Sequence, residues 1–307
     1  MKKSFGRFIC MILVGFTSFA QSSLTILGTY QDGGRPHIGC SKACCAALRG
    51  QPNPLHRVVS LGLYDQTTQK RYLFEATPDI VLQLKDLHQI GVSKSSVQPD
   101  GIFLTHAHMG HYSGLMYLGK EALGAQKVPV YAMPRMTVFL QSNGPWEQLI
   151  SQKNIVLNPL MHGKPVILSE TLQVIPIQVP HRDEYSETVG FKIKGPHKSA
   201  LFIPDIDKWD QWDRSILKEI RQVDYAFLDA TFFDGAEINY RDIRQIPHPF
   251  VVESLEKFQE LSPTDRAKVI FIHTNHTNPI ADPDSEATRK VLEAGYRIAR
   301  IHERFEL

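Results

Sequence analysis

Histidines are concentrated in one short segment of this 307-residue chain, residues 105–111 (THAHMGH), which directly follows an apolar run. Neutral imidazole is a common ligand of divalent metal ions. A tight turn after a strand can direct the imidazoles of His106 and His108 toward one ion. His111 then begins the next helix, from which it can reach a neighbouring site. A single histidine would more often be an ordinary surface or core residue, but this spacing predicts a metal centre.

Histidine and aspartate also stand where other apolar runs end. The residues that follow five separate runs are His106, His181, Asp205, Asp229 and His273. In a layered α/β protein the carboxyl ends of strands meet along one edge, where ligands bind. Any strand must end at some polar residue, so one such end would mean little. Five ends that use only His and Asp predict one shared site.

The apolar runs predict the elements that position these residues. Several runs are continuous, which is typical of strands buried on both faces, and strands outnumber helices. This pattern predicts an α/β fold with two sheets and helices outside them. The predicted strands are 24–27, 58–63, 72–74, 102–104, 128–131, 172–179, 189–193, 200–203, 225–228 and 269–272. The predicted helices are 80–90, 114–118, 135–141, 215–221, 250–261 and 285–294. No second domain boundary is visible, so residues 21–307 are expected to form a single domain.

The first twenty residues differ from the rest of the chain. A basic head precedes an apolar run at residues 8–16, which is too short for a stable membrane anchor. Residues 18–20 (Ser-Phe-Ala) place small side chains at −3 and −1 of a cleavage point. This pattern is typical of a bacterial signal peptide. We expect residues 1–20 to be removed and the mature protein to be periplasmic or secreted; an uncleaved anchor is the alternative.

The overall composition is that of a globular protein, with 42% hydrophobic and 21% charged residues. This balance excludes disordered, collagen-like and coiled-coil chains. The formal net charge is +2, and removing Lys2, Lys3 and Arg7 with the signal peptide gives 2 − 3 = −1. A near-neutral chain without blocks of like charge is not expected to bind nucleic acid. We expect a small-molecule substrate.

The histidine segment resembles the H-x-H-x-D-H motif of the metallo-β-lactamase superfamily, and the later His and Asp residues follow that superfamily's order. Segments 26–40 and 273–280 resemble its branch of pyrroloquinoline-quinone (PQQ) synthesis B proteins. The resemblance implies a four-layer αββα sandwich with a metal site between the sheets, and it places Glu75 where the superfamily has a structural Asp. The ligands it implies are His106, His108 and His181 for a first ion, Asp205 as a bridge, and His111, Asp205 and His273 for a second ion. Zinc is the expected metal, with iron or manganese as alternatives.

The chain departs from this motif at Gly110, where the family has an aspartate that ligates the second ion. Glycine supplies no side-chain ligand. The second site is therefore left with His111, Asp205 and His273. We expect a weaker second ion, a water molecule in the gap, or a centre with one metal.

Three cysteines remain after removal of the signal peptide: Cys40, Cys44 and Cys45. An odd number in six residues is a poor disulfide framework. Relatives carry C-x-C-x-x-C here and hold a structural zinc together with the second His of His-x-x-His. Lys42 stands at the middle position, and Cys44 is expected to replace it, which gives Cys40, Cys44, Cys45 and His276 as tetrahedral ligands. A disulfide from Cys40 to Cys44 or Cys45, or free thiols, are the alternatives.

Residues 229–232 (DATF) followed by His248 resemble ribonuclease Z and its relatives, in which such a histidine assists the departing group. His248 is therefore a candidate proton donor. The alternative is an ordinary loop histidine between two prolines. Asp229 is a candidate to hold a metal-binding imidazole by a hydrogen bond.

The resemblance implies an exported metal-dependent hydrolase that acts on an ester, amide or phosphodiester through metal-activated hydroxide. Asp205 would orient the ions and the nucleophile, and His248 would protonate the leaving group. Two other classes stay open. An iron-dependent oxygenase related to the PQQ branch would use the histidine and Asp205 ligands for Fe(II). A non-catalytic metal-binding protein is permitted by Gly110.

Overall fold

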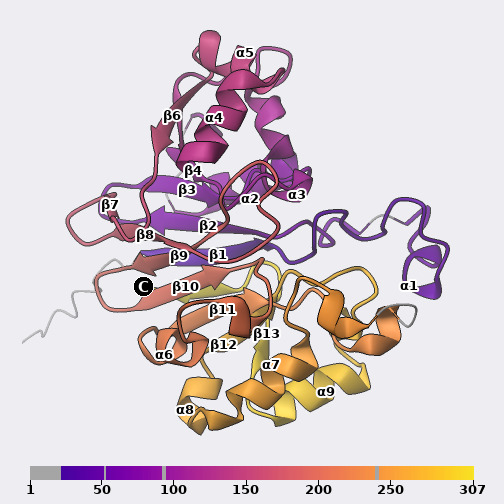
Figure 1. The fold of residues 1–307 in the computed structure, drawn as a ribbon. Coiled ribbons are helices and arrows are strands. Elements are labelled where there is room, and N and C mark those ends of the chain that lie inside the picture. Colours follow the sequence, from indigo (N-terminus) through magenta and orange to yellow (C-terminus); the bar gives the residue numbers. More distant parts are fainter. Residues whose placement is uncertain (1–21, 52, 92–94, 239–241) are drawn as a thin grey trace, which may run out of the picture.

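The computed structural model describes residues 22–51, 53–91, 95–238 and 242–307, so the expected signal peptide lies outside the described residues. Within these ranges the strands form two seven-stranded sheets that lie face to face (Figure 1). The first sheet consists, in order, of β14 (Arg304–Glu306), β1 (Ser23–Gly28), β2 (Ser60–Asp65), β3 (Lys70–Phe74), β4 (Gly101–Phe103), β5 (Val128–Ala132) and β6 (Ile155–Pro159). The second consists of β13 (Arg297–Ile298), β12 (Val269–Ile272), β11 (Tyr225–Asp229), β10 (Ser199–Ile203), β9 (Val189–Lys194), β8 (Gln173–Gln178) and β7 (Val166–Ile167).

Helices cover the outer faces of both sheets, so the order of layers is αββα, as expected (Figure 1). On the first sheet lie α2 (Ile80–Gln89), α3 (Met109–Tyr112), α4 (Pro134–Ser142) and α5 (Trp146–Ser151). On the second lie α6 (Ile216–Arg221), α7 (Val251–Lys257), α8 (Pro263–Arg266) and α9 (Glu286–Glu293). A projecting loop carries α1 (Ala43–Ala46). The 3₁₀ helices are η1 (Ser113–Leu118), η2 (Trp209–Gln211), η3 (Gly235–Ile238), η4 (Ile243–Gln245), η5 (Phe258–Glu260) and η6 (Pro279–Ala281). In the described part of the chain no helix has the length and apolar character needed to cross a membrane.

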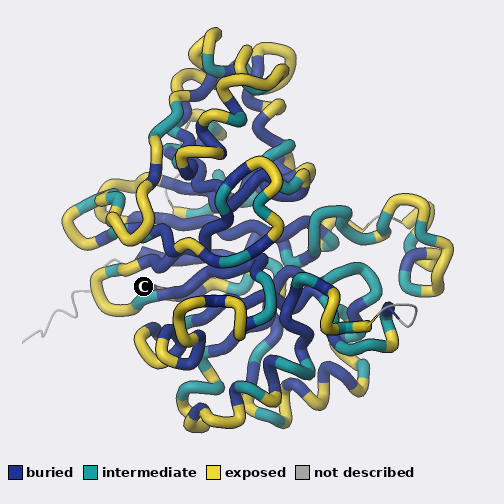
Figure 2. Tube along the Cα trace, viewed as in Figure 1, coloured by how far each residue is buried: buried dark blue, intermediate teal, exposed yellow. Residues whose placement is uncertain are grey.

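The main core lies between the two sheets, where the described strands are almost entirely buried (Figure 2). Side chains alternate between the faces of a strand. On β4, Phe103 enters the inter-sheet core while Ile102 packs under the helices. Phe74 links the sheets, because its ring lies 5.4 Å from that of Phe191 and 6.1 Å from that of Phe202. Coverage of both faces explains the continuous apolar runs.

One edge of the sandwich collects strand ends from both sheets. Strands β10, β11 and β12 are parallel neighbours, as are β3 and β4, so the segments that follow them emerge together. The Val189 amide donates a hydrogen bond across the edge to the Thr105 carbonyl at 3.1 Å. After β1 the chain passes between the sheets, where Tyr30 forms parallel bridges with Val58 and Thr274. The edge is therefore closed by backbone contacts on both sides of the site.

Candidate metal centre

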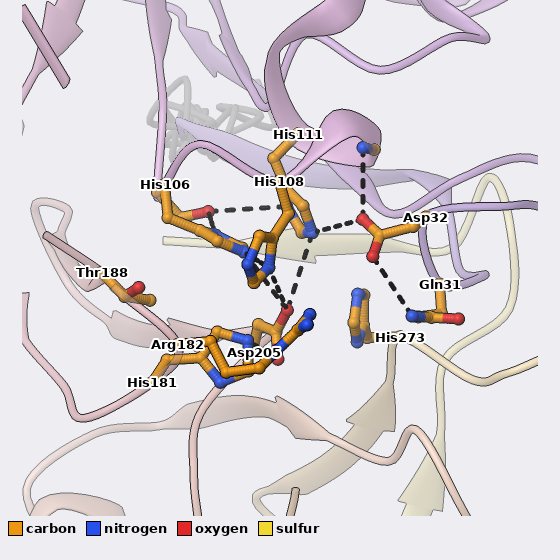
Figure 3. Close-up of polar contacts among 12 residues, drawn as sticks. Gln31, Asp32, His106, His108, His111, His181, Arg182, Thr188, Asp205 and His273 are labelled. Atoms are coloured by element: carbon orange, nitrogen blue, oxygen red, sulfur yellow. Dashed lines mark hydrogen bonds and ion pairs between the residues drawn. The ribbon is translucent and has the colours of Figure 1, made fainter. Parts of the chain in front are cut away.

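The predicted strand-end residues meet at this edge, and Figure 3 labels four of them, His106, His181, Asp205 and His273. His106 follows β4, His181 follows β8, Asp205 follows β10 and His273 follows β12, while Asp229 is the last residue of β11. All five are less than a tenth exposed. Parallel strands bring these residues together although they are far apart in the sequence. The arrangement agrees with the shared site predicted from the strand ends.

The first donor set consists of His106, His108, His181 and Asp205, whose ligand atoms all lie within 4.8 Å of one another. Asp205 Oδ2 is 3.3 Å from His106 Nε2, and Asp205 Oδ1 is 3.1 Å from His181 Nε2. Ligands of a tetrahedral zinc at bond lengths of about 2.0–2.2 Å lie roughly 3.3–3.6 Å apart. The four side chains therefore have the spacing and chemistry of a metal-binding set.

Each imidazole of this set is oriented through its other ring nitrogen. His106 Nδ1 is 2.9 Å from Thr105 Oγ1, His108 Nε2 is 3.2 Å from a Glu184 carboxylate oxygen, and His181 Nδ1 is 3.3 Å from Asp207 Oδ1. Metal-binding histidines are usually held by such bonds, which fix the ring orientation and the tautomer. One nitrogen of each ring is thus left to face the centre.

Several donor atoms here are buried without a hydrogen bond from any described residue: Nε2 of His111, His181 and His273, and Oδ1 of Asp205. A buried polar atom without a partner costs about 1–3 kcal/mol. The lone pairs of these atoms point toward common positions and do not pair with one another. A cation bound at those positions would accept them. This observation shows that the residues fit a divalent metal.

A second donor set lies beside the first and consists of Asp32, His111 and His273. Asp32 Oδ1 is 3.2 Å from His111 Nε2, and Asp205 Oδ2 is 3.9 Å from the same nitrogen. His273 Nδ1 is 3.0 Å from the Thr231 hydroxyl, which leaves Nε2 for the centre. Asp205 thus lies between the two sets, in the bridging place that the resemblance implies.

Asp32 was missed by the sequence analysis, and its position corrects the expectation for Gly110. A Cβ atom added to Gly110 would lie 2.3 Å from Asp32 Oδ1 and 2.5 Å from Asp32 Cα. A carboxylate from the opening loop therefore occupies the space next to His111. The second set is not limited to His111, Asp205 and His273. The sequence signal is the Asp32-Gly33-Gly34 triplet in segment 26–40, which carried no predicted role.

Two residues around the second set have left-handed backbone conformations, Glu75 (φ 72°) and His273 (φ 66°). Such conformations cost a non-glycine residue of order 1–3 kcal/mol and often occur at functional sites. Glu75 is buried, with Oε1 3.4 Å from His111 Nδ1, and its other oxygen accepts a hydrogen bond from the Thr105 amide at 3.3 Å. Glu75 therefore orients the segment that carries the histidines.

His248 lies next to the first set and is held by Asp229. His248 Nδ1 is 2.9 Å from Asp229 Oδ2 and 3.2 Å from Asp205 Oδ1. The Asp229 oxygens also accept bonds from the backbone amides of Ile206 and Thr231 and from the Thr231 hydroxyl. Because these bonds use its oxygens, Asp229 is better placed to position His248 than to ligate an ion. Asp229 Oδ1 also lies 3.9 Å from Nδ1 of His273, a predicted metal ligand, as sequence analysis expected.

Carboxylates dominate the charge of the centre. Burial lowers the pKa of His248, but the charges of Asp229 and Asp205 raise it to about 10. Burial likewise opposes the effect of Asp205 on His181, whose pKa rises to about 9. Burial, with the neighbouring His111, keeps the pKa of His106 well below its usual value. Net attraction for positive charge is what a cation site requires.

The cysteine loop forms a separate donor set with His276. The sulfurs of Cys40 and Cys44 are 4.0 Å apart and those of Cys44 and Cys45 are 3.9 Å apart, while His276 Nδ1 is 3.7 Å from the last two. Ligands of a tetrahedral zinc with Zn–S bonds of about 2.3 Å are roughly 3.8 Å apart. The three cysteines are thiols in this structure, not a disulfide. The four predicted residues are brought together and fit structural zinc.

Comparisons with known proteins point to one family. The model of the beta-lactamase superfamily domain matches residues 70–274. Coenzyme PQQ synthesis protein B of Methylorubrum extorquens (strain PA1) is 24% identical over 304 residues, covering 90% of this chain and 97% of that protein.

Solved structures show the same fold. Zn(2+)-bound PqqB from Methylobacterium extorquens has a TM-score of 0.77 at 18% identity and covers 93% of this chain and 100% of its own. A diphosphatase from the PhnP family has a TM-score of 0.67 at 22% identity, with coverage of 94% and 98%. The family model spans more than half of the chain, and the layer order agrees with it: the chain belongs to the metallo-β-lactamase superfamily.

Proposed function

We propose that this protein is an exported metal-dependent hydrolase that cleaves an ester, amide or phosphodiester bond. The observation that carries the proposal is the position of Asp205 between two donor sets. Its carboxylate belongs to the set with His106, His108 and His181, and Oδ2 is also 3.9 Å from His111 of the other set. A carboxylate shared between two ion positions is typical of two-metal hydrolases. Zinc is the proposed ion, and iron or manganese would suit the same nitrogen and oxygen donors.

A bound divalent ion would lower the pKa of its water to about 7 and polarise the bond to be broken. The protein supplies the remaining functions. Asp205 orients the nucleophile through the oxygen that faces the centre. His248 Nδ1 is held by Asp229, so Nε2 is the nitrogen that donates a proton to the leaving group.

The proposed substrate is a small anionic molecule. The side chains of His108 and Asp32 are 14% and 17% exposed, so the centre opens on their side. The exposed Arg182 side chain points in Figure 3 toward the space bounded by Asp205 and His273. Its only described ion pair is a loose one, 3.8 Å to Glu184. A guanidinium in this place favours a phosphodiester, because arginine binds phosphate through paired hydrogen bonds. The structural neighbour named as a diphosphatase agrees with this preference.

Hydrolysis of bis(p-nitrophenyl) phosphate, a p-nitrophenyl ester and a p-nitroanilide by the zinc- or manganese-loaded protein tests the proposal. His181→Ala should abolish turnover together with retention of the first ion, whereas His197→Ala, an exposed histidine outside the centre, should change neither. A fully loaded protein that cleaves none of the three probes would remove the hydrolase proposal. Metal retention without any turnover would leave a metal-binding protein.

An iron-dependent oxygenase is the second candidate, supported by the curated relatives named PQQ synthesis protein B. The first donor set offers histidines and one carboxylate, as in non-haem Fe(II) oxygenases. Oxygen consumption by the Fe(II)-loaded protein in the presence of tyrosine-containing peptides would support this candidate. Equal rates with the His181→Ala variant would argue against it.

Export and a single-domain organisation of residues 21–307 complete the proposal. Strand β1 begins at Ser23, just beyond the expected cleavage point, and Leu307 donates its backbone N–H to the Ser22 carbonyl at 2.8 Å. The inter-sheet core likewise includes both Leu24 and Leu307. N-terminal sequencing of protein from a periplasmic extract should begin at or near Gln21. Recovery of only full-length protein from the cytosol would contradict export.

A further inference from the structure

We propose that Asp32 is the carboxylate ligand of the second ion, and that Gly110 is glycine because Asp32 needs its space. The ligand function that the family assigns to the position before His111 has moved to the opening loop. The inference rests on the proposed metal centre, but it concerns ion binding and not the reaction. It makes the site a full two-metal centre instead of a degenerate one.

The backbone places Asp32 beside His273. Strand β12 ends just before His273, and the next residue, Thr274, donates its N–H to the Thr29 carbonyl at 2.9 Å. Thr274 also accepts the Gln31 N–H at 2.9 Å. These two bonds form a short parallel connection between the opening loop and the segment after β12. Asp32 follows Gln31 directly and is thereby fixed next to a predicted ligand.

Two further hydrogen bonds orient the Asp32 carboxylate. The Gly110 N–H donates to Oδ1 at 3.2 Å, and Gln31 Nε2 donates to Oδ2 at 3.2 Å. Oδ1 is also 3.2 Å from His111 Nε2, close to the spacing expected of two ligands of one ion. The Nε2 atoms of His111 and His273 are completely buried and form no hydrogen bond with a described residue. These two nitrogens and Oδ1 converge on one position and offer three donors to a divalent cation.

A side chain at position 110 is incompatible with the present position of Asp32. A Cβ at position 110 would lie 2.5 Å from Asp32 Cα, a backbone atom that cannot rotate away. An aspartate at 110 therefore requires the opening loop to move. Conversely, glycine at 110 allows the backbone of α3 to approach Asp32 closely enough for the Gly110 N–H to bind its carboxylate. The position of the opening loop thus requires glycine at 110, and the Asp32 carboxylate uses the close approach that this glycine permits.

A titration with Mn²⁺ alone, followed by electron paramagnetic resonance, measures the ions directly. Mn²⁺ prefers nitrogen and oxygen ligands, so it should not fill the cysteine set. The wild-type protein should bind two Mn²⁺ that are spin-coupled across Asp205. Asp32→Ala should weaken the second ion by at least about 100-fold and remove the coupling, because changes even to indirect contacts weaken metal binding by 10–100-fold. Asp32→Asn, which keeps the shape without the charge, should also weaken it, whereas Asp284→Asn on the exposed surface should not.

Separate changes at the two positions provide the sharper test. Asp32→Gly should leave one tight ion, and Gly110→Asp should also weaken the second ion, because its Cβ would displace the opening loop that carries Asp32. Circular dichroism identifies any variant that fails to fold, and Asp32→Asn then decides. Two coupled ions of unchanged affinity in Asp32→Ala and Asp32→Asn would overturn the assignment. A wild-type protein that binds two ions dependent on Asp32 but hydrolyses nothing would retain this inference and remove only the hydrolase proposal.

Discussion

Replacing His248 with glutamine should slow cleavage according to how much the leaving group needs a proton. His248 is 94% buried, its Nδ1 is bound to Asp229, and its pKa is raised to about 10, so it is protonated at neutral pH. Glutamine keeps a hydrogen-bonding side chain but cannot release a proton. The change therefore removes proton transfer while retaining most of the packing.

The expected magnitude follows from general acid catalysis, which contributes about 10²–10⁴-fold. At 1.36 kcal/mol per tenfold change, this corresponds to roughly 2.7–5.4 kcal/mol of transition-state stabilisation. An alkyl phosphodiester, whose leaving alkoxide must be protonated, should lose this whole factor. Bis(p-nitrophenyl) phosphate, whose leaving group is stable as an anion, should lose little.

Asp229→Asn provides the matched control, because it keeps the shape of the partner and removes its charge. Burial lowers the pKa of His248, while the charges of Asp229 and Asp205 raise it. Losing the Asp229 charge should therefore move the alkaline fall of kcat/KM to lower pH by about 1–3 pH units. This alkaline fall should vanish in His248→Gln. Equal slowing of both substrates by His248→Gln would refute proton donation by His248, because the side chain would then only shape the site.

Two further predictions concern folding stability. Cys45→Ser should remove one zinc per chain and lower the melting temperature markedly. Ser41→Ala, an exposed change in the same loop, is the control and should change the free energy of unfolding by no more than about 0.5 kcal/mol. Unchanged zinc content and melting temperature in Cys45→Ser would refute the ligand assignment. Burial, opposed by bonds from Thr277 and the Phe233 amide, raises the pKa of Glu237 to about 7 from 4.5. The folded state therefore favours the protonated acid, so its stabilising effect is complete below pH 4.5 and is lost as the pH rises through about 7. Between pH 4.5 and 8 the free energy of unfolding should decrease by up to about 3 kcal/mol more in the wild type than in Glu237→Gln, as urea titrations would measure. Parallel plots of unfolding free energy against pH would contradict this.

The buried strands were predictable because local sequence determines them. Residues 269–272 form β12 as predicted, since their apolar side chains alternate between two covered faces. Strand β6 (Ile155–Pro159) was missed because it lies at a sheet edge and is only partly buried. Strand β14 (Arg304–Glu306) was missed because its pairing with β1 joins distant parts of the chain. Segment 114–118 is a 3₁₀ helix, and the predicted helix 250–261 consists of α7 and η5.

The candidate site was predictable where ligands follow strands. His106, Asp205 and His273 were predicted because parallel strands determine where their ends meet. Asp32 was not predicted because its place depends on a loop contact with Gly110, 78 residues away, which has no spacing rule. The cysteine loop lies between these cases, since its residues suggested a metal but only the structure separated three thiols from a disulfide.

The contact between Asp32 and Gly110 also restricts the routes by which such a centre can evolve. Aspartate cannot be accommodated at both positions while the loop keeps its place, because the added Cβ would meet the Asp32 backbone. Because the clash is with the backbone of position 32, a lineage that moves the acid to position 110 must also change the path of the opening loop, and not only the residue at position 32. Homologous sequences should therefore show the acid at one position or the other, and a search that requires it before His111 would overlook two-metal proteins of this kind.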